Sequence, residues 1–154
     1  MNCATLQHKL PHATILDPAA GEVLEITVRV PPADLFATLQ TLRQDPELQL
    51  DLLANLAGVD YPPERIRIHY HLVSLSLKHR LCVQVDLPRA DPEVASVVPI
   101  WNAANFFERE VYDLFGVRFL GHPNLKRILM DDDFVGWPLR KDFTHPQLVH
   151  KPER

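Results

Sequence analysis

The positions of the prolines limit where long helices and strands can form in this chain of 154 residues. Proline lacks a backbone N–H donor, so it interrupts both helices and the hydrogen-bond ladders of sheets. The 14 prolines leave two long uninterrupted stretches, residues 64–87 and 100–122. The long strands and the longest helix are expected in these two stretches, with short elements and extended connections elsewhere.

The first stretch has the period-two pattern of β-strands. Apolar side chains alternate with mainly polar ones and resume after a turn near residues 78–80: Ile66, Ile68, Tyr70, Leu72, then Leu81, Val83 and Val85. Such alternation indicates strands with one buried face, here an antiparallel hairpin. The same pattern predicts a strand over residues 22–30. Residues 48–61 fit either a strand or a helix, and a strand is favoured.

The second stretch has the spacing of an amphipathic helix. Its apolar residues recur in steps of four and three: Ile100, Ala104, Phe107, Val111 and Leu114. Gly116 follows where the left-handed residue that ends a helix would fall. The charged side chains are predicted to point away from this apolar face: Glu108, Arg109, Glu110 and Asp113.

Two further segments precede the hairpin. Leu35, Leu39 and Leu42 follow the Pro31-Pro32 break at helical spacing, which predicts a helix of about three turns. Residues 1–21 allow at most a short helix and a turn. Together these elements predict a single α+β core domain over residues 1–120.

The last part of the chain loses all periodicity. Residues 121–154 are rich in proline, yet they carry more apolar side chains than a solvated tail would: Ile128, Leu129, Phe134, Trp137, Leu139 and Phe143. Apolar side chains in a segment without its own core must be buried elsewhere. We expect an extended C-terminal tail that packs against something other than itself.

Charge and cysteine content exclude several classes of function. The net charge of −4 provides no basic surface for phosphate backbones, so nucleic acid is not an expected partner. No apolar run reaches the roughly 18 residues that span a bilayer. Cys3 and Cys82 form no CxxC pair, and Cys82 is expected to be a buried thiol in a reducing compartment.

The motifs of catalysis and cofactor binding are missing from the sequence. It contains no GxGxxG, P-loop, GxSxG or paired CxxC motif. His69 and His71 share one strand face and would supply half a metal site, but no third ligand is evident, so ordinary strand histidines and no metal are predicted. Residues 131–133 are three aspartates and are expected to form a charged turn. The absence of catalytic and cofactor-binding motifs favours a binding or scaffold role.

The C-terminal third nevertheless resembles a known family. Its helix carries Glu108-Arg109-Glu110 and Asp113-Leu114-Phe115-Gly116, its turn is Gly121-His122-Pro123, and its tail runs from Pro138 to Phe143. In order and spacing, these motifs resemble the C-type subunit of NADH-quinone oxidoreductase, the 30 kDa subunit of respiratory complex I. A looser likeness extends over residues 22–145.

The resemblance implies a two-layer α+β domain with a mixed β-sheet of about four or five strands, two main helices and an extended C-terminal tail that binds partners. It also implies a structural subunit in the peripheral arm, on the cytoplasmic side of the cell membrane. Its chief neighbour there would be the homologue of the D-type subunit, which forms the quinone cavity and is called the quinone-cavity subunit below.

The cofactors of the complex are implied to lie in other subunits. The complex moves electrons from NADH through FMN and Fe-S clusters to quinone and pumps protons. By this resemblance the chain would bind none of these cofactors and would not insert into the membrane.

Two other interpretations stay open at this level. One is the equivalent subunit of a related complex, either an NAD(P)H- or ferredoxin-plastoquinone type or a hydrogenase type. The other is an autonomous enzyme that uses carboxylates.

The resemblance also carries over individual residues as interface or structural positions. They are Glu108, Arg109, Glu110, Asp113, Gly116, His122, Pro123, Arg127, Arg140, Lys141 and Asp142. The charged members are expected to form interface or intradomain ion pairs. Arg127 and Arg140 are predicted to clamp carboxylates with two parallel hydrogen bonds.

Overall fold

The hairpin predicted from residues 64–87 forms the centre of the sheet. The computed structural model describes residues 3–18, 21 and 25–145, and in it β4 (Arg65–Ser74) pairs antiparallel with β5 (His79–Pro88). Side chains of β4 alternate between buried and half-buried along all of its length. The prediction of an antiparallel hairpin with one core face is therefore confirmed.

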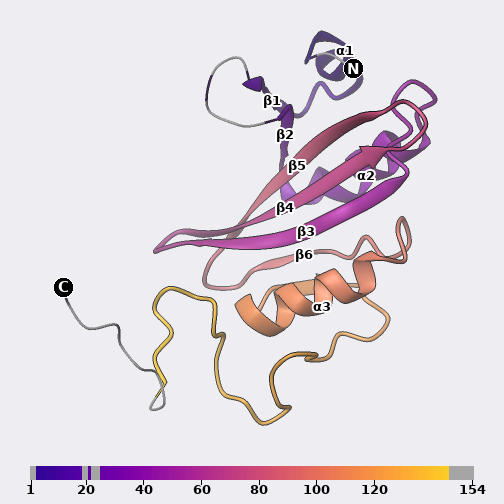
Figure 1. Cartoon of the computed structure of the whole chain (residues 1–154). Coiled ribbons are helices and arrows are strands. Elements are labelled where there is room, and N and C mark those ends of the chain that lie inside the picture. Colours follow the sequence, from indigo (N-terminus) through magenta and orange to yellow (C-terminus); the bar gives the residue numbers. More distant parts are fainter. Residues whose placement is uncertain (1–2, 19–20, 22–24, 146–154) are drawn as a thin grey trace, which may run out of the picture.

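Three more strands complete a five-stranded sheet in the order β1-β2-β5-β4-β3 (Figure 1). β3 (Leu52–Tyr61) lies antiparallel to β4, which settles the ambiguous segment as a strand. β2 (Thr27–Val30) runs parallel to β5, so the sheet is mixed as predicted. β1 (Thr14–Leu16), which the sequence did not indicate, pairs antiparallel with β2.

The strand predicted for residues 22–30 is shorter than its pattern suggested. Among the described residues of this segment, only Thr27–Val30 are in β2, while residues 25 and 26 precede it in irregular conformation. Residues 22–24 lie outside the described part of the chain.

One face of the sheet is covered by helices. α2 (Leu35–Gln44) follows a single 3-10 turn, η2 (Pro32–Asp34), and buries Leu35, Leu39 and Leu42 completely. This confirms the predicted helix. α1 (Cys3–Lys9) places the fully buried Leu6 in the same hydrophobic core, so the N-terminal segment contributes to the fold.

A second, small sheet is formed by the strands that precede and follow the predicted long helix. β6 (Glu93–Ala95) pairs parallel with β7 (Arg118–Leu120), and α3 (Ala104–Phe115) lies between them in sequence. α3 packs beside β3 (Figure 1). The Phe115 ring lies over Gly58, where an added Cβ would be 3.0 Å from Phe115 Cδ2.

The described part of the tail, residues 121–145, contains no helix or strand and returns to the end of α3. The Leu139 N–H donates to the Leu114 carbonyl over 3.1 Å. The surface on which the tail packs in this structure is therefore the chain's own domain. Among the described residues, no helix combines the length and apolar character needed to cross a membrane.

Candidate functional site

α3 ends where the sequence predicted, and the glycine that follows it receives the tail. Gly116 has φ +75°, and its N–H donates to the Tyr112 carbonyl over 2.9 Å. A Cβ at this position would lie 2.7 Å from Cδ2 of Trp137. Glycine is thus required both by the left-handed backbone and by the indole packed against it.

Asp113 is the residue that fixes the tail to α3. Its side chain is fully buried, and Oδ2 accepts the consecutive backbone N–H groups of Ile128, Leu129 and Met130 over 2.7–3.0 Å. Oδ1 accepts from Arg127 Nη1 over 2.8 Å. Burial raises the pKa of Asp113, but these donors outweigh it and the pKa is lowered overall. The carboxylate therefore stays ionised as the centre of a folded loop.

Among the described residues, neither Arg127 nor Arg140 clamps a carboxylate with two bonds, although Arg127 forms an ion pair with Asp113 within the domain. Arg127 gives one bond to the Asp113 carboxylate, donates to the Gly136 carbonyl over 3.1 Å, and lies 4.7 Å from the Trp137 ring centroid. Arg140 donates through Nε to the Phe115 carbonyl over 2.7 Å. Both guanidinium groups are used on backbone carbonyls, because these are the unpaired acceptors at the end of a helix and in an irregular loop.

A two-bond clamp beside the tail joins two other residues, which sequence reasoning did not connect. Arg89 donates Nε and Nη2 to the two carboxylate oxygens of Asp60 over 2.7 and 3.0 Å. Asp60 also accepts the Lys141 backbone N–H, and Arg89 also donates to Asp142 over 2.5 Å. The Arg89 hydrogen bond is the main reason that the pKa of Asp60 is lowered. This cluster ties the ends of β3 and β5 to the tail.

Glu108 is not a surface residue, which corrects the expectation that the charged side chains of α3 point away from the core. It is fully buried and accepts the Ser96 hydroxyl over 2.7 Å and the Val97 N–H over 2.6 Å. Burial raises its pKa to about 7, and the two donors only partly offset this. The segment after β6 covers this side of α3, and the tail covers Asp113, so both acids face protein.

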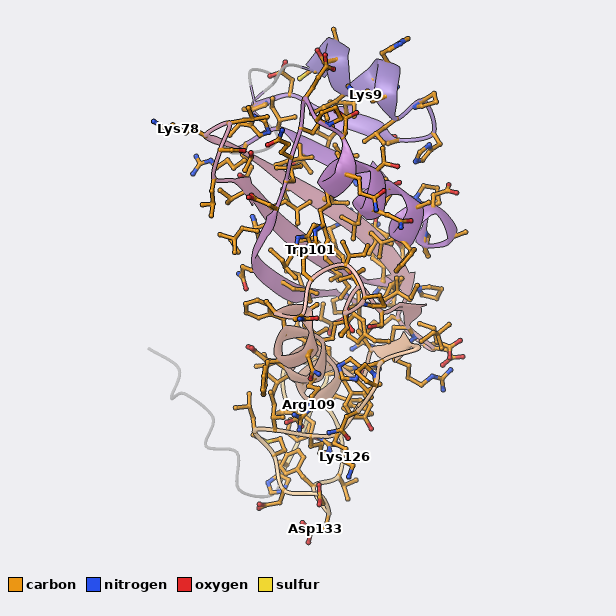
Figure 2. The ribbon with its side chains drawn as sticks, turned by 90° about the vertical axis from the view of Figure 1, so that its right-hand side faces the viewer. Lys9, Lys78, Trp101, Arg109, Lys126 and Asp133 are labelled. Carbon is orange, nitrogen blue, oxygen red and sulfur yellow. The ribbon has the colours of Figure 1, made fainter. Side chains whose placement is uncertain are left out.

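The remaining predicted positions are more exposed. Arg109 donates to the carbonyls of Lys126 and Arg127, while Glu110 is exposed to solvent. Figure 2 shows Arg109 and Lys126 near the end of the molecule that carries Asp133. Because Glu108 is enclosed and Glu110 is exposed, the two acids do not face a common space. An enzyme that relied on this carboxylate pair is not supported.

The turn after β7 uses its histidine to connect backbone groups. His122 donates through Nε2 to the Asn105 carbonyl over 3.2 Å and accepts the Asn124 N–H at Nδ1. Burial lowers its pKa. Pro123 is exposed beside it. His122 therefore links the start of the tail to the first turn of α3.

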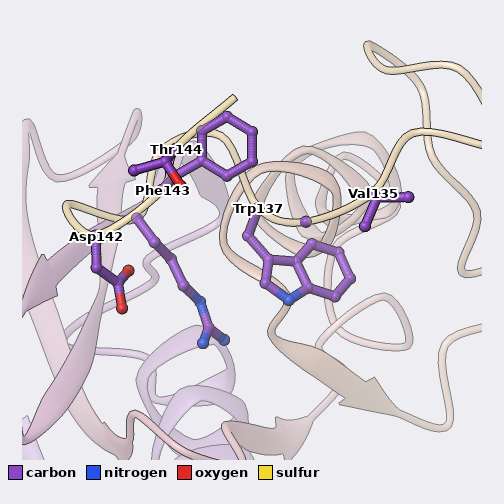
Figure 3. A pocket seen from close by; sticks show the side chains of 7 residues that line it. Val135, Trp137, Asp142, Phe143 and Thr144 are labelled. Carbon is purple, nitrogen blue, oxygen red and sulfur yellow. The ribbon is translucent and has the colours of Figure 1, made fainter. Parts of the chain in front are cut away.

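The outer surface of the tail carries exposed apolar side chains and an open hollow. Four apolar side chains of α3 and the tail are more than half exposed: Phe106 66%, Leu129 56%, Val135 85% and Leu139 51%. An open hollow of about 360 Å³ lies between Val135, Trp137, Arg140 and Phe143 (Figure 3). Exposed apolar groups gathered at one end of a molecule are typical of a protein-binding surface.

A candidate metal-binding group lies on the five-stranded sheet, on the face opposite the hydrophobic core. The sequence offered His69 and His71 without a third ligand. The structure adds Cys82 from β5, and one ligand atom from each of the three residues lies within 4.8 Å of the others. Sequence spacing could not reveal it, since the pairing of β4 with β5 brings Cys82 opposite His71.

The family model and similar curated proteins name the same subunit. The model of the respiratory-chain NADH dehydrogenase, 30 Kd subunit, matches residues 28–148. The C-type subunit of NADH-quinone oxidoreductase from Moorella thermoacetica is 49% identical over 123 residues, which cover 79% of this chain and 82% of that protein. The corresponding subunit from Roseiflexus castenholzii is 42% identical over 142 residues, covering 90% and 80%.

Solved structures agree with the sequence comparisons. A trypsin-resistant fragment of Nqo5 superposes with a TM-score of 0.66 at 31% identity, covering 79% of this chain and 96% of the fragment. A chain of the membrane-bound sulfane sulfur reductase, an archaeal respiratory membrane complex, gives 0.74 at 26% identity, covering 92% and 82%. The chain therefore belongs to the family of the 30 kDa subunit of respiratory-chain NADH dehydrogenase.

Proposed function

We propose that this chain is a structural subunit of the peripheral arm of an NADH-quinone oxidoreductase, bound to the quinone-cavity subunit through α3 and the tail. In this role it carries no redox cofactor: FMN, the Fe-S clusters and quinone belong to other subunits. It joins the membrane complex from the cytoplasmic side without inserting into the bilayer. Its contribution is to hold neighbouring subunits in register.

The observation that carries the proposal is the set of exposed apolar side chains on α3 and on a tail that is hydrogen-bonded to the domain. The Asp113 loop and the Asp60–Arg89 cluster fix the described part of the tail at two points, residues 127–130 and 141–142. Val135, between these points, and Leu129, within the Asp113 loop itself, remain exposed. Loop side chains that are ordered before binding lose little conformational entropy on association, so they suit a permanent interface.

The separation of the buried acids from the surface supports a non-catalytic role. Glu108 and Asp113 have no exposed surface and are already paired within the chain. A general acid or base must come within hydrogen-bond reach of a substrate. Glu108 and Asp113 are therefore suited to stabilising the fold, and the exposed surface of α3 and the tail is the part that can bind a partner.

Co-expression with the quinone-cavity subunit from the same source tests the proposal. Val135→Asp and Leu129→Asp place a charge in the proposed interface, where an unpaired carboxylate is costly to bury. We expect each variant to fold normally and to lose capture of the quinone-cavity subunit in a pull-down, by at least tenfold.

Leu75→Asp is the matched control. Leu75 is 64% exposed in the turn between β4 and β5. Lys78 of the same turn lies at the opposite end of the molecule from Asp133 (Figure 2). The Leu75→Asp substitution introduces the same charge at a comparable exposure and should leave capture of the quinone-cavity subunit unchanged. Equal capture by the wild type and Val135→Asp would show that this end of the molecule is not the interface.

A further inference from the structure

The face of the sheet opposite α2 bears a line of polar side chains on its central strands. On β4 and β5 the side chains that alternate with the core are polar or titratable: Arg67, His69, His71, Cys82, Gln84 and Asp86. Arg67 and Asp86 neutralise each other through two hydrogen bonds of 2.6 and 2.8 Å. The histidines and the cysteine remain as a separate group.

These three residues are arranged as ligands of one ion. His69 and His71 are two apart on β4, and Cys82 stands directly opposite His71 in the ladder. His69 Nδ1 lies 3.8 Å from Cys82 Sγ, and one ligand atom of each residue falls within 4.8 Å of the others. Nitrogen and sulfur ligands of a tetrahedral Zn²⁺ are separated by about 3.5 Å, given the usual bond lengths.

Glu25 orients one of the histidines. His71 Nδ1 lies 2.8 Å from Glu25 Oε1, and because a carboxylate can only accept, Nδ1 carries the proton. The lone pair of His71 Nε2 is then free to bind a metal. A carboxylate behind a histidine is the usual support of a metal ligand, since it fixes the ring and the tautomer. Glu25 itself is held by Arg80 over 3.4 Å.

The burial of the group also fits a metal ligand set. His69 Nε2 is buried and has no hydrogen-bond partner among the residues that the structure describes. The Cys82 side chain is buried as well.

We propose that His69, His71 and Cys82 form a Zn²⁺ site, with Glu25 as the positioning residue of His71 and water in the fourth position. Two imidazoles and a thiolate favour Zn²⁺ over Mg²⁺ or Ca²⁺, which prefer oxygen. On binding, the Cys82 S–H bond breaks, a Zn–S bond forms and the proton passes to solvent. Because zinc has no redox chemistry, the ion would fasten β4 to β5 and to the segment before β2. The inference is independent of the proposed function.

Metal titration of the purified full-length chain tests this site. After treatment with a chelator, Zn²⁺ binding is measured by competition with a chromophoric indicator, and Co²⁺ is added separately as a spectroscopic probe. We expect one Zn²⁺ per chain and a thiolate-to-cobalt charge-transfer band. Cys82→Ser should remove the band, and His69→Gln should weaken Zn²⁺ binding at least tenfold.

Two further variants separate the site from nonspecific binding. Glu25→Gln should weaken Zn²⁺ by about 10- to 100-fold while retaining the band, as expected for a group that supports a ligand. Cys3→Ser removes the other cysteine, whose Sγ lies 3.2 Å from Asp17, and should change nothing. Because Cys82→Ser changes a buried side chain, its result is interpreted together with that of His69→Gln. A missing cobalt band in the wild type, or full-strength Zn²⁺ binding by His69→Gln, would overturn the proposal.

Discussion

Glu108 is a buried acid whose proton is coupled to folding. Its pKa rises from the ordinary 4.5 to about 7 in the folded chain because burial penalises the carboxylate. Between these two values the folded state holds a proton that the unfolded state has lost, so the free energy of unfolding falls as pH rises. The size of the effect is on the order of 3 kcal/mol across this range.

Glu108→Gln tests this coupling. The amide keeps the shape and can still accept from Val97, but it cannot titrate. Urea unfolding at pH values from 4.5 to 7.5 should show the wild type losing about 3 kcal/mol relative to the variant as pH rises. Glu110→Gln, exposed on the same helix, should follow the wild type. A constant difference between wild type and Glu108→Gln would mean that Glu108 does not titrate in this range.

Gly116 combines two requirements that separate experiments can distinguish. An Ala there adds a Cβ to a left-handed backbone and against the Trp137 ring. Gly121 has a similar φ of +80° with nothing within 4 Å of an added Cβ. Gly121→Ala should therefore cost about 1 kcal/mol from the backbone alone, and Gly116→Ala about 1–3 kcal/mol more. The midpoint of urea unfolding measures both, and equal losses would exclude the packing contribution of Trp137.

At the scale of elements, α3 and the tail form one unit in which the Asp113 carboxylate accepts four hydrogen bonds from the tail. Asp113→Ala leaves Arg127 and three backbone N–H groups without their acceptor, which should cost about 3 kcal/mol. Hydrogen exchange should become fast at residues 128–130, while the amides of β4 and β5 keep their protection.

Glu110→Ala on the same helix is the comparison for this prediction. Glu110 is exposed, and its removal should change stability by less than about 0.5 kcal/mol. If both variants behaved alike, the loop at residues 127–130 would be held by its apolar contacts and not by Asp113.

At the scale of the whole molecule, the Asp60–Arg89 pair joins the sheet to the tail. Asp60 has a lowered pKa, caused first by Arg89, so its contribution to stability is present above the ordinary pKa of 3.8 and is lost as pH falls through the folded value. Arg89→Ala should reduce the free energy of unfolding by about 3 kcal/mol near neutral pH, because Asp60 stays buried.

The pH dependence of this loss is what identifies the pair. The difference between wild type and Arg89→Ala should shrink below the ordinary pKa of 3.8, as the Asp60 carboxyl becomes protonated. Arg89→Lys keeps the charge but not the two-bond geometry, and should lose an intermediate amount. A loss that did not change with pH would assign it to the packing of the Arg89 side chain. Chemical denaturation in acid and at neutral pH makes the comparison.

The elements that could be predicted from the sequence are those whose signal is local. The alternation of Ile66 with Arg67 along β4, and the helical spacing that ends at Gly116, depend only on neighbours in the chain. The family resemblance rests on the same continuous segments, which is why it identified the fold as two-layer and mixed. Short elements such as β1 and β6 have too few residues for a periodic pattern and were missed.

The hairpin, the two main helices, the end of α3 and the family could all be predicted from local sequence patterns. Which charged residues are buried depends on how distant segments pack together. Glu108 and Asp113 look like surface positions by spacing, yet the segment after β6 and the tail cover them. Asp60 finds Arg89 across 29 residues, and Cys82 meets His69 across 13. Periodicity records which face of an element is apolar, whereas charge pairing depends on which distant segment folds over that face.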